Sequence, residues 1–201
     1  MVQAIVLAAG RSERMGLENK LLMSIGDKTV LRATMENLCH SIIDKITVVT
    51  GFDYDETINE LGDLDAEIIY NGSHKEGMTS SIKAGISQLK GELEQLMICL
   101  ADMPLLKPED YNALIEFYRE VSLSDSKPIV RPAYGENFGH PVIFHPSYSK
   151  QLLSTTHHNG SREVINDHRK HLHLFEAKGI KYFFDIDTPK DYNRLIRYLD
   201  L

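Results

Sequence analysis

The sequence is poor in cysteine and contains no block of basic residues. Its 201 residues include two cysteines, Cys39 and Cys99, which lie far apart in hydrophobic surroundings. A disulfide framework or a zinc site requires further ligands at short spacing, so we expect both thiols to be core residues in a reducing compartment. Lysines and arginines are scattered, and the formal net charge is −7 at pH 7. The sequence therefore argues against a nucleic-acid-binding protein.

Long hydrophobic runs are also absent. The apolar stretch at residues 1–10 has no basic segment before it, is followed at once by charged residues, and is too short to span a bilayer. We therefore expect a soluble, cytoplasmic protein without a membrane partner. Asn-Gly-Ser stretches at residues 71–73 and 159–161 match the glycosylation pattern, but without a secretory signal we interpret them as turns.

The order of apolar segments predicts the fold class. Hydrophobic residues make up 42% of the chain, which is ample for the core of a single domain over residues 1–201. Short apolar runs typical of β-strands alternate with segments of helical periodicity. The expected strands are residues 2–9, 45–51, 66–71 and 96–102, and the expected helices are residues 29–42, 54–63 and 77–91.

Continuously apolar strands joined by amphipathic helices predict a mostly parallel sheet covered on both faces. The expected architecture is a three-layer, Rossmann-like α/β fold. A helix over residues 108–121 begins with proline and acidic residues, and residues 127–134 and 140–146 indicate a small β-rich insertion. A last helix is expected over residues 188–199.

Ligands of open α/β sheets bind at the carboxyl ends of the strands, and the first such place is the loop after residue 7. Small residues at positions 8–10 let the backbone approach a ligand closely, and Arg11, Arg14 and Lys20 supply positive charge. The loop matches neither the G-x-G-x-x-G nor the P-loop pattern. A phosphate-bearing ligand explains these residues economically. The alternative is that the arginines are solvated or pair with nearby glutamates.

Two further strand ends carry polar groups. Asn71 ends one expected strand, and residues 77–81 begin the following helix, where Ser80 and Ser81 either contribute to a site or simply cap the helix. Asp102 follows an apolar strand and is the type of hard oxygen ligand that Mg²⁺ prefers.

The fourth place is the stretch FFDIDTPKDY, residues 183–192. We expect Asp185 and Asp187 to alternate along a strand and to point to opposite faces, so that only one of them faces the site. Asp191 is interpreted as structural, because Thr188-Pro189 resembles a helix start and an acidic residue there suits the helix dipole. Cations, a glycine loop and carboxylates, without an obvious protein nucleophile, are the equipment of direct phosphoryl or nucleotidyl transfer.

The stretch LAAGRSERMGLENK, residues 7–20, resembles the signature of the MobA-like nucleotidyltransferases, which include molybdenum cofactor guanylyl- and cytidylyltransferases. The resemblance continues through NGSHKEGMTSSIKAG, LADMP, GHPVIF and DIDTPKDY in the family's order, and so covers nearly the whole chain. It implies the nucleotide-diphospho-sugar transferase fold and transfer of a nucleotide, with Mg²⁺, to the terminal phosphate of molybdopterin. By the same resemblance, the nucleotide would be bound by Leu7, Ala8, Ala9, Gly10, Arg14, Lys20, Asn71 and Ser81, and the metal by Asp102 and Asp187.

The L-A-A-G form of the first motif accompanies cytidylyl transfer in this family, so the resemblance is closest to the MocA-like branch and CTP is preferred over GTP. His140, in GHPVIF, and Arg162 are implied to bind the acceptor, although His140 could instead be an ordinary turn residue. The chain departs from the family at His157 and His158, where members usually carry glycine and aspartate. This departure concerns the acceptor more than the nucleotide.

Other functions remain open. A sugar- or polyol-phosphate cytidylyltransferase would use the same nucleotide half, but GHPVIF favours the molybdenum branch. A non-catalytic binding chaperone for a molybdenum hydroxylase would not need Arg14, Lys20 and both carboxylates. Histidines crowd residues 157–173, but the expected positions on a strand, a loop and a helix argue against a transition-metal site.

Overall fold

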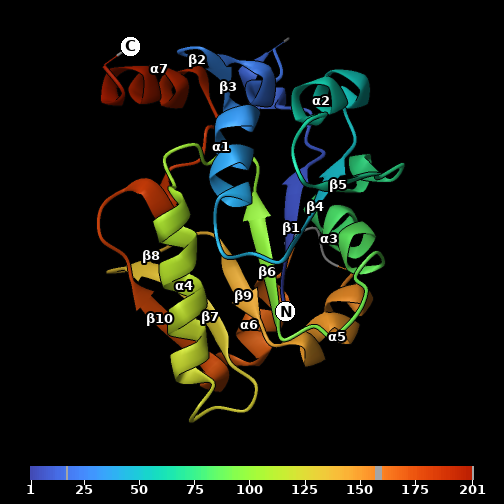
Figure 1. Cartoon of the computed structure of the whole chain (residues 1–201), viewed down its shortest axis with the longest axis vertical. Coiled ribbons are helices and arrows are strands. Elements are labelled where there is room, and N and C mark those ends of the chain that lie inside the picture. The colour runs from blue at the N-terminus through green and yellow to red at the C-terminus, as the bar shows by residue number, and fades with distance from the viewer. Residues whose placement is uncertain (17, 157–159, 201) are drawn as a thin grey trace.

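A mostly parallel sheet of eight strands forms the middle layer of the molecule (Figure 1). The computed structural model describes residues 1–16, 18–156 and 160–200. The strand order is β10-β7-β9-β6-β1-β4-β5, β8 pairs with β7, and a separate hairpin is formed by β2 (Ser24–Ile25) and β3 (Lys28–Thr29). The sheet strands are β1 (Val2–Ala8), β4 (Lys45–Thr50), β5 (Glu67–Tyr70), β6 (Gln95–Leu100), β7 (Ile129–Tyr134), β8 (Asn137–Phe138), β9 (Val142–Phe144) and β10 (Leu172–Glu176).

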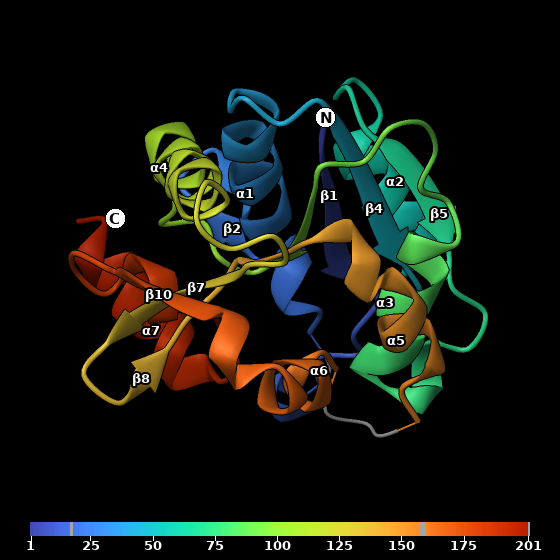
Figure 2. The same ribbon diagram turned by 90° about the horizontal axis from the view of Figure 1, so that it is seen from below.

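Helices cover both faces of this sheet, which confirms the three-layer expectation (Figure 2). One face is covered by α1 (Val30–Cys39), α2 (Tyr54–Leu61) and α4 (Pro108–Val121). The other face is covered by α3 (Met78–Ile86), α5 (Ser149–Ser154) and α6 (Arg162–Asp167). Helix α7 (Pro189–Tyr198) packs beside the β2-β3 hairpin, and the hydroxyl of Tyr192 donates to the carbonyl of Ser24 at 2.6 Å.

The continuous apolar character of the central strands follows from burial on both faces. On β1, Val6 packs in the core beneath α1 and α4, whereas its neighbour Ile5 packs in the core beneath α3. The same division separates Cys99 from Ile98 on β6. Since successive side chains of a strand point to opposite faces, a strand buried on both faces needs an apolar residue at every position.

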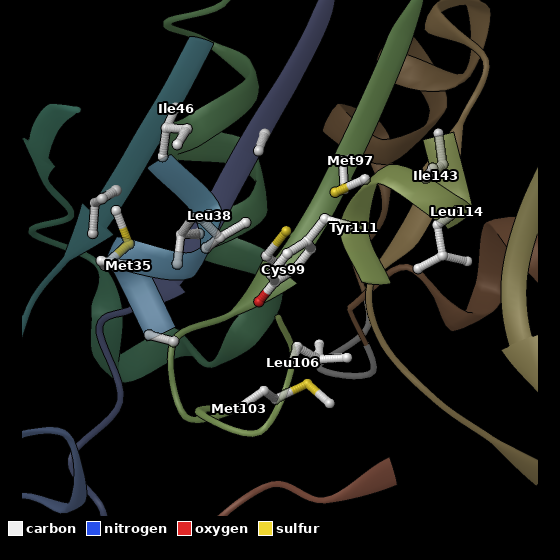
Figure 3. Close-up of a cluster of buried hydrophobic side chains, with 14 of the residues drawn as sticks. Met35, Leu38, Ile46, Met97, Cys99, Met103, Leu106, Tyr111, Leu114 and Ile143 are labelled. Carbon is white, nitrogen blue, oxygen red and sulfur yellow. The ribbon is translucent and has the colours of Figure 1, made fainter. Parts of the chain in front are cut away.

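The larger core lies between the sheet and helices α1 and α4. Met35 of α1 and Tyr111 and Leu114 of α4 meet Met97 and Cys99 of β6 (Figure 3). Met35 is fully buried, so truncating it to alanine should cost ~2–5 kcal/mol of folding stability.

The two cysteines take the places expected for core thiols. Both are free: Cys99 is buried on β6, and Cys39 is partly buried at the end of α1. Burial raises the pKa of the Cys99 thiol, so this side chain behaves as a small apolar residue rather than a reactive one.

The last helix begins as its sequence predicts. The side chain of Thr188 accepts a hydrogen bond from the backbone N–H of Asp191, and the carboxylate of Asp191 accepts one from the N–H of Thr188 at 2.8 Å. Pro189 lies in the first turn, where a backbone N–H would have no partner within the helix, so the missing N–H of proline costs no hydrogen bond. These reciprocal bonds confirm the structural interpretation of Asp191.

The strands expected in a β-rich insertion extend the central sheet. Strand β9 runs antiparallel to both β6 and β7, and β8 turns back against β7. Consequently the residues just before β9 lie beside the carboxyl end of β6. None of the helices in the described part of the chain has the length and apolar content required of a membrane span.

Candidate functional site

A cavity of about 330 Å³ opens at the carboxyl ends of β1 and β6. Parallel pairing places these ends together, because Leu7 of β1 is in register with Leu100 of β6. Of the residues predicted to bind nucleotide or metal, Ala8 and Asn71 do not line the cavity. Those that line it are Leu7, Ala9, Gly10, Arg14, Lys20, Ser81, Asp102 and Asp187.

The loop after β1 presents its backbone to this cavity. In the described part of the chain, no hydrogen bond engages the backbone N–H groups of Gly10 and Arg11. A Cβ added to Gly10 would meet nothing within 4 Å, so the space over this residue is open. Free amides beside open space can bind an anion or the edge of a base.

The far end of this loop is held by Asn19, which was not predicted as a site residue. Its side-chain oxygen accepts from the backbone N–H of Leu21 at 3.0 Å, and its amide donates to Asp53 at 3.1 Å. The backbone N–H of Lys20 donates to the hydroxyl of Ser12 at 3.2 Å. These bonds hold the backbone from which Lys20 reaches into the cavity.

Lys20 is the central cation of the site. Its Nζ forms ion pairs with Asp102 and, at 3.0 Å, with Asp187. Arg14 contacts the other oxygen of Asp187 at 2.9 Å, but its side chain is 71% exposed, so this ion pair is weak. Arg11 lies over the ring of Phe52 with its guanidinium carbon 5.0 Å from the centroid. The sequence left open that the arginines pair with nearby glutamates. Arg14 instead pairs with Asp187.

Burial and charge oppose each other within this group. Burial raises the pKa of Asp102, and the adjacent Lys20 ammonium lowers it in part. Burial alone would lower the pKa of Lys20, but Asp102 and Asp187 outweigh burial and raise it. We therefore describe the pair as a lysinium held against a carboxylate, in which each charge compensates the desolvation of the other.

The expectation that only one of Asp185 and Asp187 faces the site is wrong. Carboxylate oxygens of Asp102, Asp185 and Asp187 lie within 4.8 Å of one another, and all three residues line the cavity. Residues two apart in an extended segment share a face, and here residues 184–187 form no strand at all. The sequence signal for this cluster was the spacing of Asp185 and Asp187, which are two residues apart.

Three converging carboxylates suit a divalent cation. Burial and the charges of Asp102 and Asp187 raise the pKa of Asp185, as expected where like charges crowd together. An all-oxygen set of this type matches the preference of Mg²⁺ or Mn²⁺ rather than that of a soft metal. The residues present therefore fit the metal that the motif implies.

Asn71 acts on the cavity through Ser81. Its buried amide donates to the hydroxyl of Ser80 at 2.9 Å and to that of Ser81 at 3.1 Å. Helix α3 begins at Met78 after Gly77, whose position carries no side-chain cap. The serines thus do not cap the helix; Ser81 instead presents a fixed hydroxyl to the cavity wall.

His140 and Arg162 lie in a second cavity of about 210 Å³, which shares the side chain of Met78 with the first. Burial and the charge of Arg131 lower the pKa of His140 to about 4, so the ring is neutral at neutral pH. Arg131 of β7 also lines this cavity; it was not predicted as a site residue, although it begins the stretch RPAYGENFGHPVIF that contains His140.

The described histidines of residues 168–173 line neither cavity. His171 Nδ1 and His173 Nε2 both contact the carboxylate of Asp125, at 2.8 and 2.9 Å, and His168 bonds to Gln151. His157 and His158 lie outside the described residues.

Comparison with known proteins identifies the class. The structure superposes on a nucleotidyl transferase from Methanothermobacter (Mth528) with a TM-score of 0.85 at 22% identity, covering 99% of this chain and 97% of that one. Rv0371c from Mycobacterium tuberculosis gives a TM-score of 0.84 at 22% identity over 98% and 97% of the two chains. A second structure of Rv0371c, in complex with manganese, gives 0.78 at 21% over 98% of each chain. The fold is that of the nucleotide-diphospho-sugar transferases.

The chain belongs to the family of the MobA-like NTP transferase domain, whose model matches residues 4–172. A probable molybdenum cofactor guanylyltransferase from Methanosarcina mazei is 30% identical over 75% of this chain, and the match spans only 64% of that protein's length. Another probable molybdenum cofactor guanylyltransferase, from Natranaerobius thermophilus, is 24% identical over 98% of this chain and 96% of its own. These names agree with the predicted family but not with its cytidylyl branch.

Proposed function

We propose that this protein is a Mg²⁺-dependent nucleotidyltransferase that transfers CMP from CTP to the terminal phosphate of molybdopterin and releases pyrophosphate. The observation that carries the proposal is the convergence of Lys20 and Arg14 with the three carboxylates in one cavity. Cations suit a triphosphate, and clustered carboxylates suit the metal that accompanies it.

In this proposal the nucleotide lies along the loop after β1. The free N–H groups of Gly10 and Arg11 bind phosphate or base atoms, and the hydroxyl of Ser81 hydrogen-bonds the ribose or the base. Arg14 and Lys20 contact the triphosphate, which requires the Lys20 ammonium to share its contacts with Asp102 and Asp187.

The reaction is an in-line displacement at the α-phosphorus. An oxygen of the acceptor phosphate forms the new bond, and the bond to the oxygen that bridges the α- and β-phosphates breaks. Arg14 and Lys20 stabilise the charge that develops on the departing pyrophosphate. Mg²⁺ bound by Asp102, Asp185 and Asp187 would neutralise phosphate charge. A phosphate monoester is already anionic near neutral pH, so no strong general base is required.

The choice of CTP rests on Ala9, the second alanine of the L-A-A-G stretch, which lines the cavity. The guanylyltransferase names of the relatives make GTP the competing nucleotide. The manganese complex of Rv0371c supports a divalent metal in this fold. For the acceptor, we propose His140 and Arg162 as ligands of its phosphate, and a molybdenum hydroxylase as the enzyme that receives the product.

The test is pyrophosphate release by the purified protein with Mg²⁺ and molybdenum cofactor, comparing CTP, GTP and ATP. Release with CTP alone supports the whole proposal, and release with GTP alone overturns the nucleotide assignment. CTP binding without release overturns the acceptor and directs attention to phosphorylated sugars and polyols. A protein that hands over cofactor without any turnover would be a binding chaperone instead.

A further inference from the structure

The cavity beside the nucleotide site gathers two arginines from distant parts of the chain. Arg131 comes from β7, Arg162 begins α6, and His140 lies just before β9. The remaining lining residues are the hydroxyl-bearing Ser161 and the apolar Met78, Val142 and Ile165. Among the described residues, the lining of this cavity therefore has two positive groups and no acidic one.

In the described part of the chain, the two arginines line one cavity without an acidic partner. Among the residues that the structure describes, neither Arg131 nor Arg162 forms an ion pair with a carboxylate. Burial and the charge of Arg162 lower the pKa of Arg131, which shows that the two charges are close enough to repel. Like charges in a confined space become favourable only when an anion lies between them.

Arg131 is held in position by uncharged groups. Its Nε donates to the carbonyl of Gly139 at 3.1 Å, and its guanidinium lies over the ring of Phe138, 5.2 Å from the centroid. This fixes the side chain without neutralising it. The adjacent His140 Nδ1 is buried and has no hydrogen-bond partner in the described part of the chain.

The position of this cavity relates it to the transfer reaction. Strand β9 pairs with β6 through Val142 and Ile98, which places His140 beside the carboxyl end of β6. Met78 lines both cavities. A group bound between the arginines thus lies next to the nucleotide cavity.

We propose that Arg131 and Arg162 form a clamp for the dianionic phosphate monoester of the acceptor, and that Arg131 selects acceptors carrying such a group. The inference rests on the proposed nucleotidyl transfer and gives a role to Arg131, to which the family resemblance assigned none. Two guanidinium groups match the double charge of a phosphate monoester and offer several N–H donors to its oxygens. The oxygen that points away from the arginines, toward the first cavity, attacks the α-phosphorus, and pyrophosphate leaves.

The direct test measures phosphate binding without any turnover. Inorganic phosphate is titrated against the protein, and the ring signals of His140 are followed by NMR, after assignment with His140→Gln. Arg131→Met and Arg162→Met should each weaken binding about tenfold or more, and Arg131→Lys should weaken it less. Arg119→Met is the matched control, because Arg119 is paired with Glu116 on the surface of α4.

Steady-state kinetics of the transfer reaction provide a second test of the clamp. Arg131→Met should raise the KM for the phosphorylated acceptor about tenfold and leave the KM for the nucleotide within about twofold. Phosphate binding that is absent from the wild type, or that is as strong in both arginine variants as in the wild type, overturns the clamp. Phosphate binding that depends on the arginines, without transfer to any phosphorylated acceptor, retains the anion site but overturns the proposed function. Arg162 is exposed, so its substitution tests the clamp even if Arg131→Met fails to fold.

Discussion

Lys20, in the loop after β1, and Asp102, after the end of β6, form a buried ion pair inside the proposed nucleotide cavity. Their side chains are only 16% and 8% exposed, so each charge depends on the other for compensation. Asp187 joins the pair from the segment before α7. One lysine thus links three parts of the chain that are distant in sequence.

Removing this lysine should destabilise the fold. Lys20→Met leaves Asp102 buried without its cation, which should lower the free energy of unfolding by about 3 kcal/mol. Lys20→Met combined with Asp102→Asn should recover part of the loss, because no uncompensated charge remains. Urea denaturation measures both. Lys28→Met, which removes an exposed lysine paired with Glu36, should change stability little. Equal stability of wild type and Lys20→Met would contradict the coupling.

Asp185 should matter to turnover as much as Asp102. If the three carboxylates hold the metal, Asp102→Asn and Asp185→Asn should each lower kcat at least about 100-fold, with a much smaller change in nucleotide affinity. Steady-state kinetics and nucleotide titration separate the two effects. Asp63→Asn, at an exposed residue paired with Arg32, is the control. Normal turnover in Asp185→Asn would remove that residue from the metal site.

Substitution by alanine should affect nucleotide binding at one glycine and folding stability at another, because their surroundings differ. A Cβ at Gly10 meets no protein atom within 4 Å, so Gly10→Ala should leave stability unchanged and raise the KM for the nucleotide. A Cβ at Gly85 of α3 would overlap Cγ2 of Ile5, so Gly85→Ala should lower the melting temperature. Thermal unfolding and kinetics of the two variants distinguish these effects. A Gly10→Ala enzyme with wild-type KM would exclude a ligand from this loop.

His140 should contribute to the pH dependence of stability. Its pKa in the folded state is about 4, below the unfolded value of about 6.5, because burial and Arg131 disfavour the charged ring. The unfolded chain binds the proton first, so stability is lost as the pH falls from about 6.5 to about 4. His140→Gln should make the unfolding free energy fall less steeply over this range. An NMR titration of His140 with a midpoint near 6.5 would contradict the expectation.

Most elements of the fold could be predicted from local pattern. Strand β1 is apolar at nearly every position, which predicts a buried strand. Thr188, Pro189 and Asp191 predict the start of helix α7. Such signals are local because burial on two faces and capping of a helix end each leave their mark within a few residues. Arg14, Lys20 and Asp102 could be predicted as site residues for the same reason, because each follows a strand that the apolar pattern identifies.

The sequence by itself determined the α/β class, the order of most strands and helices along the chain, and the family. Only the tertiary structure decided that Asp185 joins Asp187 at the cavity, that Asn71 acts through Ser81, and that Arg131 meets Arg162. These relationships join residues from separate elements or depend on irregular backbone. Their proximity depends on strand order and on the placement of β9 beside β6, which no local pattern encodes.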